Sequence, residues 1–167
     1  MGLPNGGILA TTAGVINYTY TGVRGRITYY VPTNTSVVDA SSSGLSGEIV
    51  YNGVNEIHSI SVPITKLTAN ESTIIQAYSN SLLTVIEAES SVTLVATNCA
   101  LTAKSIGDIL YAAYADNRAN VNFNFTGGTN ANVDAINVYL DYVYNITFTG
   151  DIDTVLTANG GTIQLNP

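Results

Sequence analysis

A glutamate and a histidine two positions apart are the first candidates for acid–base chemistry in this chain of 167 residues. Glu56 and His58 lie in the strand-like segment NEIHSISV, where side chains two positions apart share a face. A carboxylate that orients an imidazole can turn it into a general base. The chain has one histidine, and neither a nucleophile motif nor a glycine-rich phosphate loop accompanies the pair. We therefore interpret His58 as a cross-strand histidine with satisfied hydrogen bonds, and we expect no enzyme activity.

Carboxylates offer a second kind of chemistry, the binding of a hard cation such as Ca²⁺. Asp151 and Asp153 stand two positions apart in the run GDID, near Asn145 and Thr149. The run lacks the spacing of an EF-hand loop, so we expect Asp151 to cap the start of a helix. One cysteine and one histidine exclude a metal site built on those residue types. We expect no metal and no cofactor.

The remaining reactive or charged residues have structural interpretations. Cys99 lies in the apolar run VTLVATNCALTA, where a buried thiol behaves as a small hydrophobe. Glu87 and Glu89 are two positions apart on a strand-like segment, and so are Arg24 and Arg26. Each pair is expected to share one solvated strand face.

Composition limits the class of protein and its partners. A hydrophobic content of 46% with 10% charged residues is typical of an ordered chain. Five basic residues and a net charge of −7 oppose binding to a phosphate backbone, so we expect no nucleic-acid partner. The sequence has no apolar run long enough to span a bilayer and no basic segment of the signal-peptide kind at Met1. We expect synthesis in the cytoplasm and no membrane partner.

The first 66 residues are predicted to be strands. The segments GVINYTYTG and GRITYYVP are short runs of tyrosine and β-branched residues bounded by glycine and proline. Asn52-Gly53 supplies the two residues that a type I′ turn prefers. We therefore predict a hairpin that pairs 48–51 with 54–57.

From Leu67 onward the hydrophobic period is that of helices, with strands between them. Thr68 with Glu71, and Ser105 with Asp108, have the spacing of helix-capping pairs. Helices are predicted over four segments: LTANESTIIQAYSN, SIGDILYAAYADN, VDAINVYLDYVY and the stub DIDTVL. The apolar faces of the second and third of these helices should meet the strands, through Ile106, Ile109, Leu110 and Ala113 and through Val133, Ile136, Leu140 and Val143.

Five strands are predicted in this half. LLTVIE and SVTLVATN are expected to form a hairpin around 88–90, and the others are NVNFNFTGG, YNITFTGD and NGGTIQLNP. Helix and strand thus alternate as a repeated unit, and such units must stack on one another to bury their apolar faces. Strands joined by crossover helices are normally parallel.

Two arrangements fit these elements: one mixed sheet with helices on one side, or a β-sandwich followed by a helix-strand layer. We prefer the second because the period changes near Pro63 and Leu67. The predicted fold class is α+β, with an N-terminal antiparallel β-sandwich-like region over 1–66 and a C-terminal helix-strand repeat region over 67–167.

Tyrosine is the residue type that indicates an interaction surface. The chain has eleven tyrosines and no tryptophan, and tyrosine is enriched at protein interfaces because it combines a large ring with a polar tip. Tyr18, Tyr20, Tyr29 and Tyr30 gather in the strand-rich first third of the chain. We predict that these four residues contact other subunits and that the protein forms a homo-oligomer.

The segment LTAKSIGDILYAAYADNRANVNFNFTGGTNANVDAINVYL resembles repeat-bearing accessory virion proteins of tailed bacteriophages, especially crAss-like phages of gut Bacteroidetes. The likeness covers 101–167. It implies a non-enzymatic virion structural protein, such as a head-decoration, fibre or connector component, that oligomerises and docks to other virion proteins. The alternatives are a bacterial adhesion or carbohydrate-binding module with tyrosines stacked on sugars, and a Ca²⁺-dependent binding module.

Overall fold

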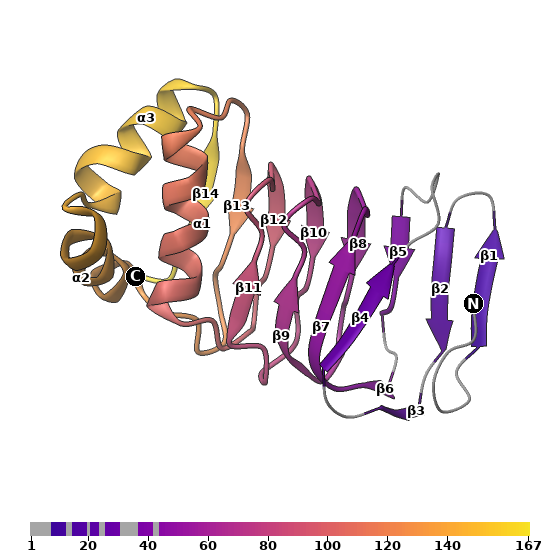
Figure 1. Cartoon of the computed structure of the whole chain (residues 1–167). Coiled ribbons are helices and arrows are strands. Elements are labelled where there is room, and N and C mark those ends of the chain that lie inside the picture. The colour runs from indigo at the N-terminus through magenta and orange to yellow at the C-terminus, as the bar shows by residue number, and fades with distance from the viewer. Residues whose placement is uncertain (1–7, 13–14, 20, 24–25, 31–36, 42–43) are drawn as a thin grey trace.

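Two layers of parallel strands form the body of the molecule, with helices at its C-terminal end (Figure 1). The computed structural model describes residues 8–12, 15–19, 21–23, 26–30, 37–41 and 44–167, and the side chains of 37–41, 46–51 and 53–167. One layer is an eight-stranded sheet. The other is a four-stranded sheet continued by helix α1 (Ala103–Ala115).

The strands of the eight-stranded sheet follow one another in sequence order. They are β1 (Ile8–Thr12), β2 (Val15–Thr19), β5 (Val37–Asp39), β8 (Glu56–His58), β10 (Ile74–Gln76), β12 (Thr93–Val95), β13 (Asn122–Asn124) and β14 (Thr162–Gln164). The four-stranded sheet consists of β11 (Val85–Glu87), β9 (Ile64–Thr68), β7 (Gly47–Asn52) and β4 (Arg26–Tyr30). A short pair links β3 (Thr21–Val23) with β6 (Gly44–Leu45).

The predicted antiparallel β-sandwich is wrong. Within the described residues, every strand pairing except that of β1 with β2 is parallel. The chain alternates between the two sheets, and we call one passage through both layers a coil. An inner strand therefore pairs with the strands of the coils before and after it, and an edge strand pairs with one of them. The molecule is therefore a mixed α/β structure built on two layers of parallel strands, and neither predicted arrangement describes it.

Coils of nearly equal length keep the stack in register. Val38 pairs with Ile57, Ile57 with Ile75 and Ile75 with Leu94, at separations of 18 or 19 positions. All four side chains are fully buried between the two layers. Because the spacing is almost constant, like residues stack on like residues along the sheet, and Phe123 of β13 continues the row.

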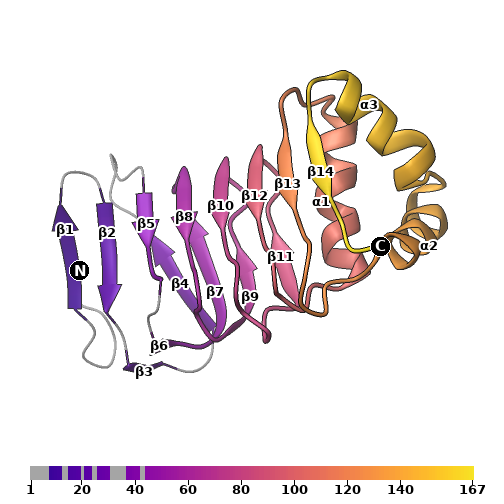
Figure 2. The ribbon, with the colours of Figure 1, turned by 180° about the vertical axis from the view of Figure 1, so that it is seen from behind.

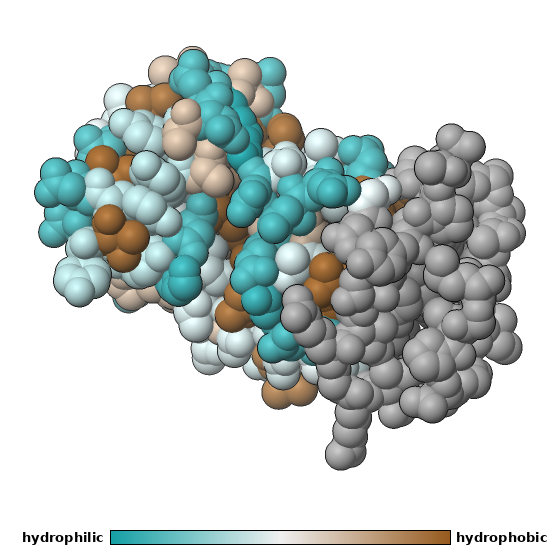
Figure 3. Space-filling model, in the orientation of Figure 1, coloured by the Kyte–Doolittle hydropathy of each residue, from teal (hydrophilic) through white to brown (hydrophobic). Residues whose placement is uncertain are grey.

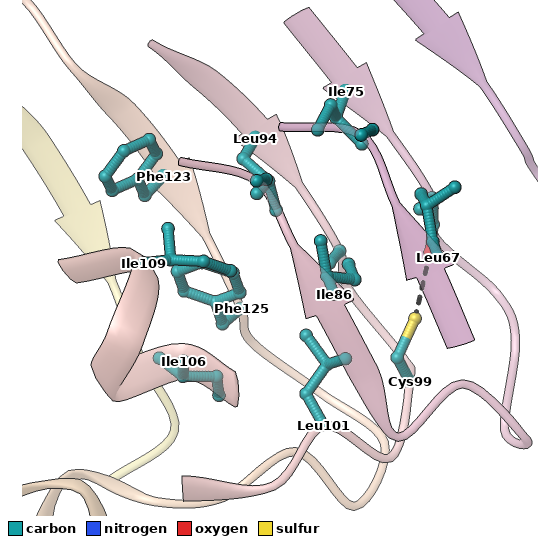
Figure 4. Packing of buried hydrophobic residues seen from close by; sticks show 14 of the residues in the cluster. Leu67, Ile75, Ile86, Leu94, Cys99, Leu101, Ile106, Ile109, Phe123 and Phe125 are labelled. Carbon is teal, nitrogen blue, oxygen red and sulfur yellow. Dashed lines mark hydrogen bonds between the residues drawn. The ribbon is translucent and has the colours of Figure 1, made fainter. Parts of the chain in front are cut away.

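A second buried row runs along the four-stranded sheet and passes into helix α1. Ile49, Leu67 and Ile86 pair in register on β7, β9 and β11. Figure 4 shows Ile106 and Ile109 of α1 facing the same interior, beyond β11. One cluster of buried side chains thus spans the described core on both sides of residue 66.

Buried polar side chains hold the corners where the chain passes between layers. The Asn130 amide donates to the carbonyls of Ala96 and Phe125 at 2.8 and 2.9 Å, and its oxygen accepts from the Leu101 N–H at 2.8 Å. Asn80 donates to the Ile64 carbonyl at 2.9 Å. These bonds satisfy backbone groups that would otherwise be buried without partners.

Gly128 shows how closely one corner approaches its neighbour. Its φ is +61°, and a Cβ there would lie 2.4 Å from the Cys99 carbonyl oxygen. The corner accepts no side chain at this position.

The helices predicted over SIGDILYAAYADN and VDAINVYLDYVY are confirmed, with changes at their ends. Helix α1 begins after Thr102, whose hydroxyl accepts from the Ser105 N–H, so Thr102 and not Ser105 is the N-cap. Helix α2 (Val133–Tyr144) begins after Asn132, which accepts from the Ala135 N–H at 3.0 Å. The face predicted for α1 is fully buried, whereas Val143 of the face predicted for α2 is exposed.

The segment YNITFTGD is not a strand: it runs from the last residue of α2 into a π-helical turn, η1 (Phe148–Ile152). The amide of Asn137 on α2 accepts from the Phe148 N–H at 2.8 Å, and Asp151 accepts from the Thr147 N–H at 2.7 Å. These side chains occupy backbone donors that a strand would need. Helix α3 (Asp153–Ala158) follows η1 directly and leads to β14.

The helix predicted over 67–80 is also wrong. This segment holds the end of β9 and all of β10, and β10 pairs on both sides, with β8 and β12. Two sets of main-chain hydrogen bonds outweigh the helix-like apolar spacing and the Thr68–Glu71 capping pattern. Glu71 accepts from the Gly53 N–H of the preceding coil at 2.6 Å instead.

Neither predicted hairpin forms. Gly53 has φ +72° and lies at a corner between β7 and β8, which belong to different sheets. The segments around 88–90 do contain strands β11 and β12, but β11 pairs with β9 and β12 with β10 and β13. Turn-forming residues here redirect the chain to the other layer.

The side chain of Ser105 ends the four-stranded sheet. Its hydroxyl accepts from the Ile86 N–H at 2.8 Å and donates to the Ile86 carbonyl at 3.1 Å. One serine on α1 thus satisfies both main-chain groups of the central residue of edge strand β11, where the next coil has a helix in place of a strand.

Within the described part of the chain, no helix has the length and apolar character of a membrane span.

Replacing Leu94 tests the stacked core. Leu94→Ala should lower the free energy of unfolding by about 2–5 kcal/mol, because it removes a buried side chain and leaves a cavity in the row. Leu82→Ala is the matched control, since Leu82 is 53% exposed, and should change it by less than about 0.5 kcal/mol. Urea denaturation measures both, and equal losses would contradict the stacking.

Replacing Ser105 tests the end of the sheet. Ser105→Ala should cost about 1–3 kcal/mol of stability, because the Ile86 N–H and carbonyl are left without their partner. The exposed Ser81→Ala should be neutral. Hydrogen exchange should show the Ile86 amide losing protection in Ser105→Ala; unchanged protection would rule out the proposed role.

Candidate functional site

A groove of about 380 Å³ lies where helix α1 replaces a strand. Its apolar lining comes from β11 and from the inner side of α1, including Ile86, Ala88 and Ile109. Glu87, Lys104 and the other polar residues Asn70, Glu89, Thr102, Ser105 and Asp108 complete the lining. The volume lies within the range of small-molecule sites, so the groove is the first place to look for chemistry.

The charged groups around the groove bond to one another. Lys66 donates to Glu87 at 2.5 Å, and Thr68 donates to the same carboxylate at 2.8 Å. The hydrogen bond from Lys66, which outweighs partial burial, holds the pKa of Glu87 below its ordinary value. The Glu87 carboxylate therefore stays ionised at neutral pH and pairs with Lys66 at the surface.

Asp108 is the centre of the most connected polar cluster. It accepts from Lys104 at 2.5 Å, from the Tyr139 hydroxyl at 2.6 Å and from the Tyr144 hydroxyl at 2.8 Å. Lys104 and Asp108 belong to α1, whereas both tyrosines belong to α2. We call these four residues the Asp108 cluster.

Proton affinities in the Asp108 cluster follow from this geometry. Burial raises the pKa of the Asp108 carboxyl, but the hydrogen bonds from Lys104, Tyr139 and Tyr144 outweigh it, and the net pKa is below the ordinary value. Burial and the bond to Asp108 raise the pKa of Tyr139 to about 12, and the same causes raise the pKa of Tyr144. Both tyrosines remain protonated donors at neutral pH.

Aromatic packing fixes the two helices around the cluster. The rings of Tyr144 and Tyr111 stack with centroids 3.7 Å apart and an interplanar angle of 7°. A Cβ on Gly107 would lie 2.6 Å from the Tyr139 ring, so glycine permits the close approach of α1 and α2. With a protonated donor on each tyrosine and a fully bonded carboxylate, the arrangement joins helices and offers no activated base or nucleophile.

The outer face of the eight-stranded sheet is open over the described strands β10, β12, β13 and β14. Seen from behind in Figure 2, no helix or second sheet covers it. Its outward side chains over the last four strands are all uncharged: Ile74, Gln76, Thr93, Val95, Asn122, Asn124, Thr162 and Gln164. We call these eight residues the neutral sheet face. Asn124 donates to Gln164 across it at 2.7 Å.

His58 and Glu56 lie side by side on β8, as predicted. Their side chains are 2.7 Å apart, between His58 Nε2 and Glu56 Oε1, and both are partly exposed. The register sets Asp39 of β5 next to His58 and Gln76 of β10 on its other side. The described surroundings contain no serine, cysteine or threonine bonded to the imidazole, so the pair is a surface contact.

Asp151 and Asp153 do not converge on a common ligand. Asp151 lies inside η1 and accepts from the N–H and hydroxyl of Thr147. Thr147 is the N-cap of η1, and α3 begins after Ile152 without a side-chain cap, so the expected N-capping by Asp151 is wrong. Asp153 accepts from the Thr157 hydroxyl at 3.2 Å. Within the part of the chain that the structure describes, no three histidine, cysteine or acidic residues gather as a metal site would require.

Cys99 is buried, as its apolar context predicted. Its thiol donates to the Ala77 carbonyl at 3.0 Å (Figure 4), and burial raises its pKa. The thiol is therefore protonated and shielded. Glu89 is exposed beside the groove, whereas Arg24 lies outside the described residues and nothing is described of the Arg26 side chain.

The four predicted interface tyrosines fall where little is described. Tyr18 lies on β2, and Tyr29 and Tyr30 lie on β4, where Tyr29 pairs with Tyr51 of β7 through the backbone. Their side chains are not described, and Tyr20 lies outside the described residues. The prediction that they form an interface therefore stays a prediction.

Sequence reasoning missed the Asp108 cluster. Tyr139 and Tyr144 are 31 and 36 positions from Asp108, and no local pattern links them. The sequence did not indicate the neutral sheet face, because β10 lies in a segment whose apolar spacing predicts a helix. The available signal was the recurrence of an apolar residue followed two positions later by a small one, at Val38, Ile57, Ile75 and Leu94.

Comparison with known proteins adds no relative to this description. No protein-family model, no curated protein and no solved structure matches the chain. The site must therefore be interpreted from its own geometry.

Alkaline titration tests the Asp108 cluster. Because their pKa values are raised, Tyr139 and Tyr144 should ionise later than ordinary tyrosines, with Tyr139 near pH 12. Their contribution to stability is complete below the unfolded value of about 10 and is lost as pH rises through the folded values. In Asp108→Asn the late phase of the tyrosine absorbance should move to lower pH.

The exposed Tyr142→Phe is the control, because Tyr142 does not belong to the Asp108 cluster and its loss should leave the late phase in place. Circular dichroism at each pH confirms that the chain is still folded. Asp108 itself should stabilise the fold above pH about 4 and lose this effect as pH falls through its lowered pKa. A late phase unaffected by Asp108→Asn would contradict the cluster.

Proposed function

We propose that the protein is a non-enzymatic structural component of a phage virion that oligomerises and docks to other virion proteins. The observation that supports docking is the neutral sheet face. In a chain of net charge −7, four neighbouring strands present eight uncharged outward side chains. The centres of protein interfaces are depleted of charged residues in the same way. The likeness of 101–167 to accessory virion proteins supplies the kind of assembly.

The architecture supports a rigid scaffold role. From β5 onward, each coil bonds to its neighbours through parallel main-chain hydrogen bonds, and a buried row continues from β5 to β13. A stack of this kind presents a surface of fixed spacing, because the strands are about 4.8 Å apart. A partner can therefore dock without ordering a loop.

A glycan ligand on the same face is the second candidate. Side-chain amides and hydroxyls of Gln76, Thr93, Asn122 and Asn124 are groups that can bond sugar hydroxyls. The same face would then serve an adhesion or carbohydrate-binding module. The two proposals differ in the partner and can be separated directly.

Placing a charge at the centre of the face tests the proposal. Val95→Arg should weaken self-association or binding to purified particles at least tenfold, because the arginine would be desolvated against a neutral partner. Leu82→Arg, on an exposed turn, should leave association unchanged. Sedimentation velocity and co-purification with particles measure the two variants.

A soluble monomer that fails to associate with any particle would reject the virion proposal. Binding on a glycan array that Val95→Arg abolishes and Leu82→Arg preserves would favour the carbohydrate-binding alternative instead.

A further inference from the structure

The outward side of helix α2 is the main exposed apolar patch among the described residues. Four large hydrophobic side chains are exposed, and three of them are on α2: Val138 at 72%, Tyr142 at 90% and Val143 at 45%. The fourth, Leu82, lies alone on a turn. A brown patch over α2 is visible at the left of Figure 3.

Helical spacing places two of these three side chains, Val138 and Tyr142, on one stripe of α2. Ala135, Val138 and Tyr142 follow one another at three and four positions, so they lie on one face of the helix. Ile136 and Leu140, on the opposite side, are fully buried against the core. Helix α2 is thus apolar on both sides, whereas a surface helix normally has a polar outer side. We call Ala135, Val138 and Tyr142 the α2 outer face.

The charges near this face are all negative. Asp134 and Asp141 are exposed on α2, and the helix carries no lysine or arginine. Between 103 and 167 the chain has six aspartates, one lysine and one arginine. Lys104 and Arg118 already pair with Asp108 and Asp116 on or just after α1. The border of the α2 outer face is therefore acidic.

From this combination we infer that the α2 outer face binds a different protein, through an apolar surface bordered by lysine or arginine. Charge complementarity favours such a partner, since basic side chains would meet Asp134 and Asp141. A second copy of the chain is disfavoured, because it would bring the same aspartates of two helices together. The inference adds a second contact to the proposed docking function and rests on that function only for the kind of partner.

Two synthetic helical peptides test the inference without any particle. One has a leucine stripe bordered by lysines, and its twin has glutamates in place of the lysines. The lysine peptide should bind the full chain, with the glutamate peptide at least tenfold weaker, in fluorescence anisotropy at low salt. Val138→Ser and Tyr142→Ser should each weaken the lysine peptide several-fold, and Leu82→Ser is the matched control that should not.

The aspartates should account for the preference between the peptides. Asp134→Asn with Asp141→Asn should bring the two affinities close together, and added salt should do the same. The inference would be overturned if both peptides bound equally or if neither bound. It would also be overturned if Val138→Ser and Tyr142→Ser left the affinity of the lysine peptide unchanged. A dimer in sedimentation that Tyr142→Ser dissociates would also overturn it, by making a second copy the occupant.

A variant of the neutral sheet face distinguishes failure of this inference from failure of the proposed function. Val95→Arg should leave peptide binding unchanged, because Val95 lies on β12 and not on α2. Failure of particle docking with intact peptide binding would then reject the virion proposal alone. Intact docking with no peptide binding would reject the α2 outer face alone.

Discussion

Main-chain hydrogen bonds between coils of nearly equal length are the constraint on which the structure depends. Parallel pairing sets Ile57 beside Ile75 and Ile75 beside Leu94, so a one-residue slip would turn every buried side chain of a strand to solvent. The three-residue strands are too short to be stable alone, and each relies on two neighbours. The regular spacing of the neutral sheet face follows from this pairing, because its residues alternate along each strand with the inward-facing ones.

At the end of the four-stranded sheet a helix, α1, takes the place of a strand, and the helical C-terminal part of the molecule begins there. Between Val38 and Leu94 the coils span 18 or 19 residues, but 29 positions separate Leu94 from Phe123 and 40 separate Phe123 from Ile163. The additional residues form α1 and then α2, η1 and α3, while β13 and β14 keep the parallel pairing. Ser105 satisfies the edge that this change creates, and the Asp108 cluster joins α2 to α1.

The sequence predicted the elements whose signals are local. Helices α1 and α2 have long apolar stripes and polar caps, and β14 alternates between turns, so each was recognised. Strands β11 and β12 also lie within predicted strands, whereas β10 lies in a segment whose apolar spacing predicted a helix. Asn52-Gly53 and the Thr68–Glu71 pair are real local signals that long-range pairing overrode. The contacts of Asp108 join distant segments, and no single-sequence pattern predicts them.

The most direct test of the account is the pairing of β12, observed by nuclear Overhauser contacts between backbone protons. Parallel stacking predicts contacts of Leu94 with Ile75 on one side and with Phe123 on the other. A local hairpin would instead give contacts between 85–87 and 93–95. Contacts of the first kind support the stack and the face it presents; contacts of the second kind would contradict both.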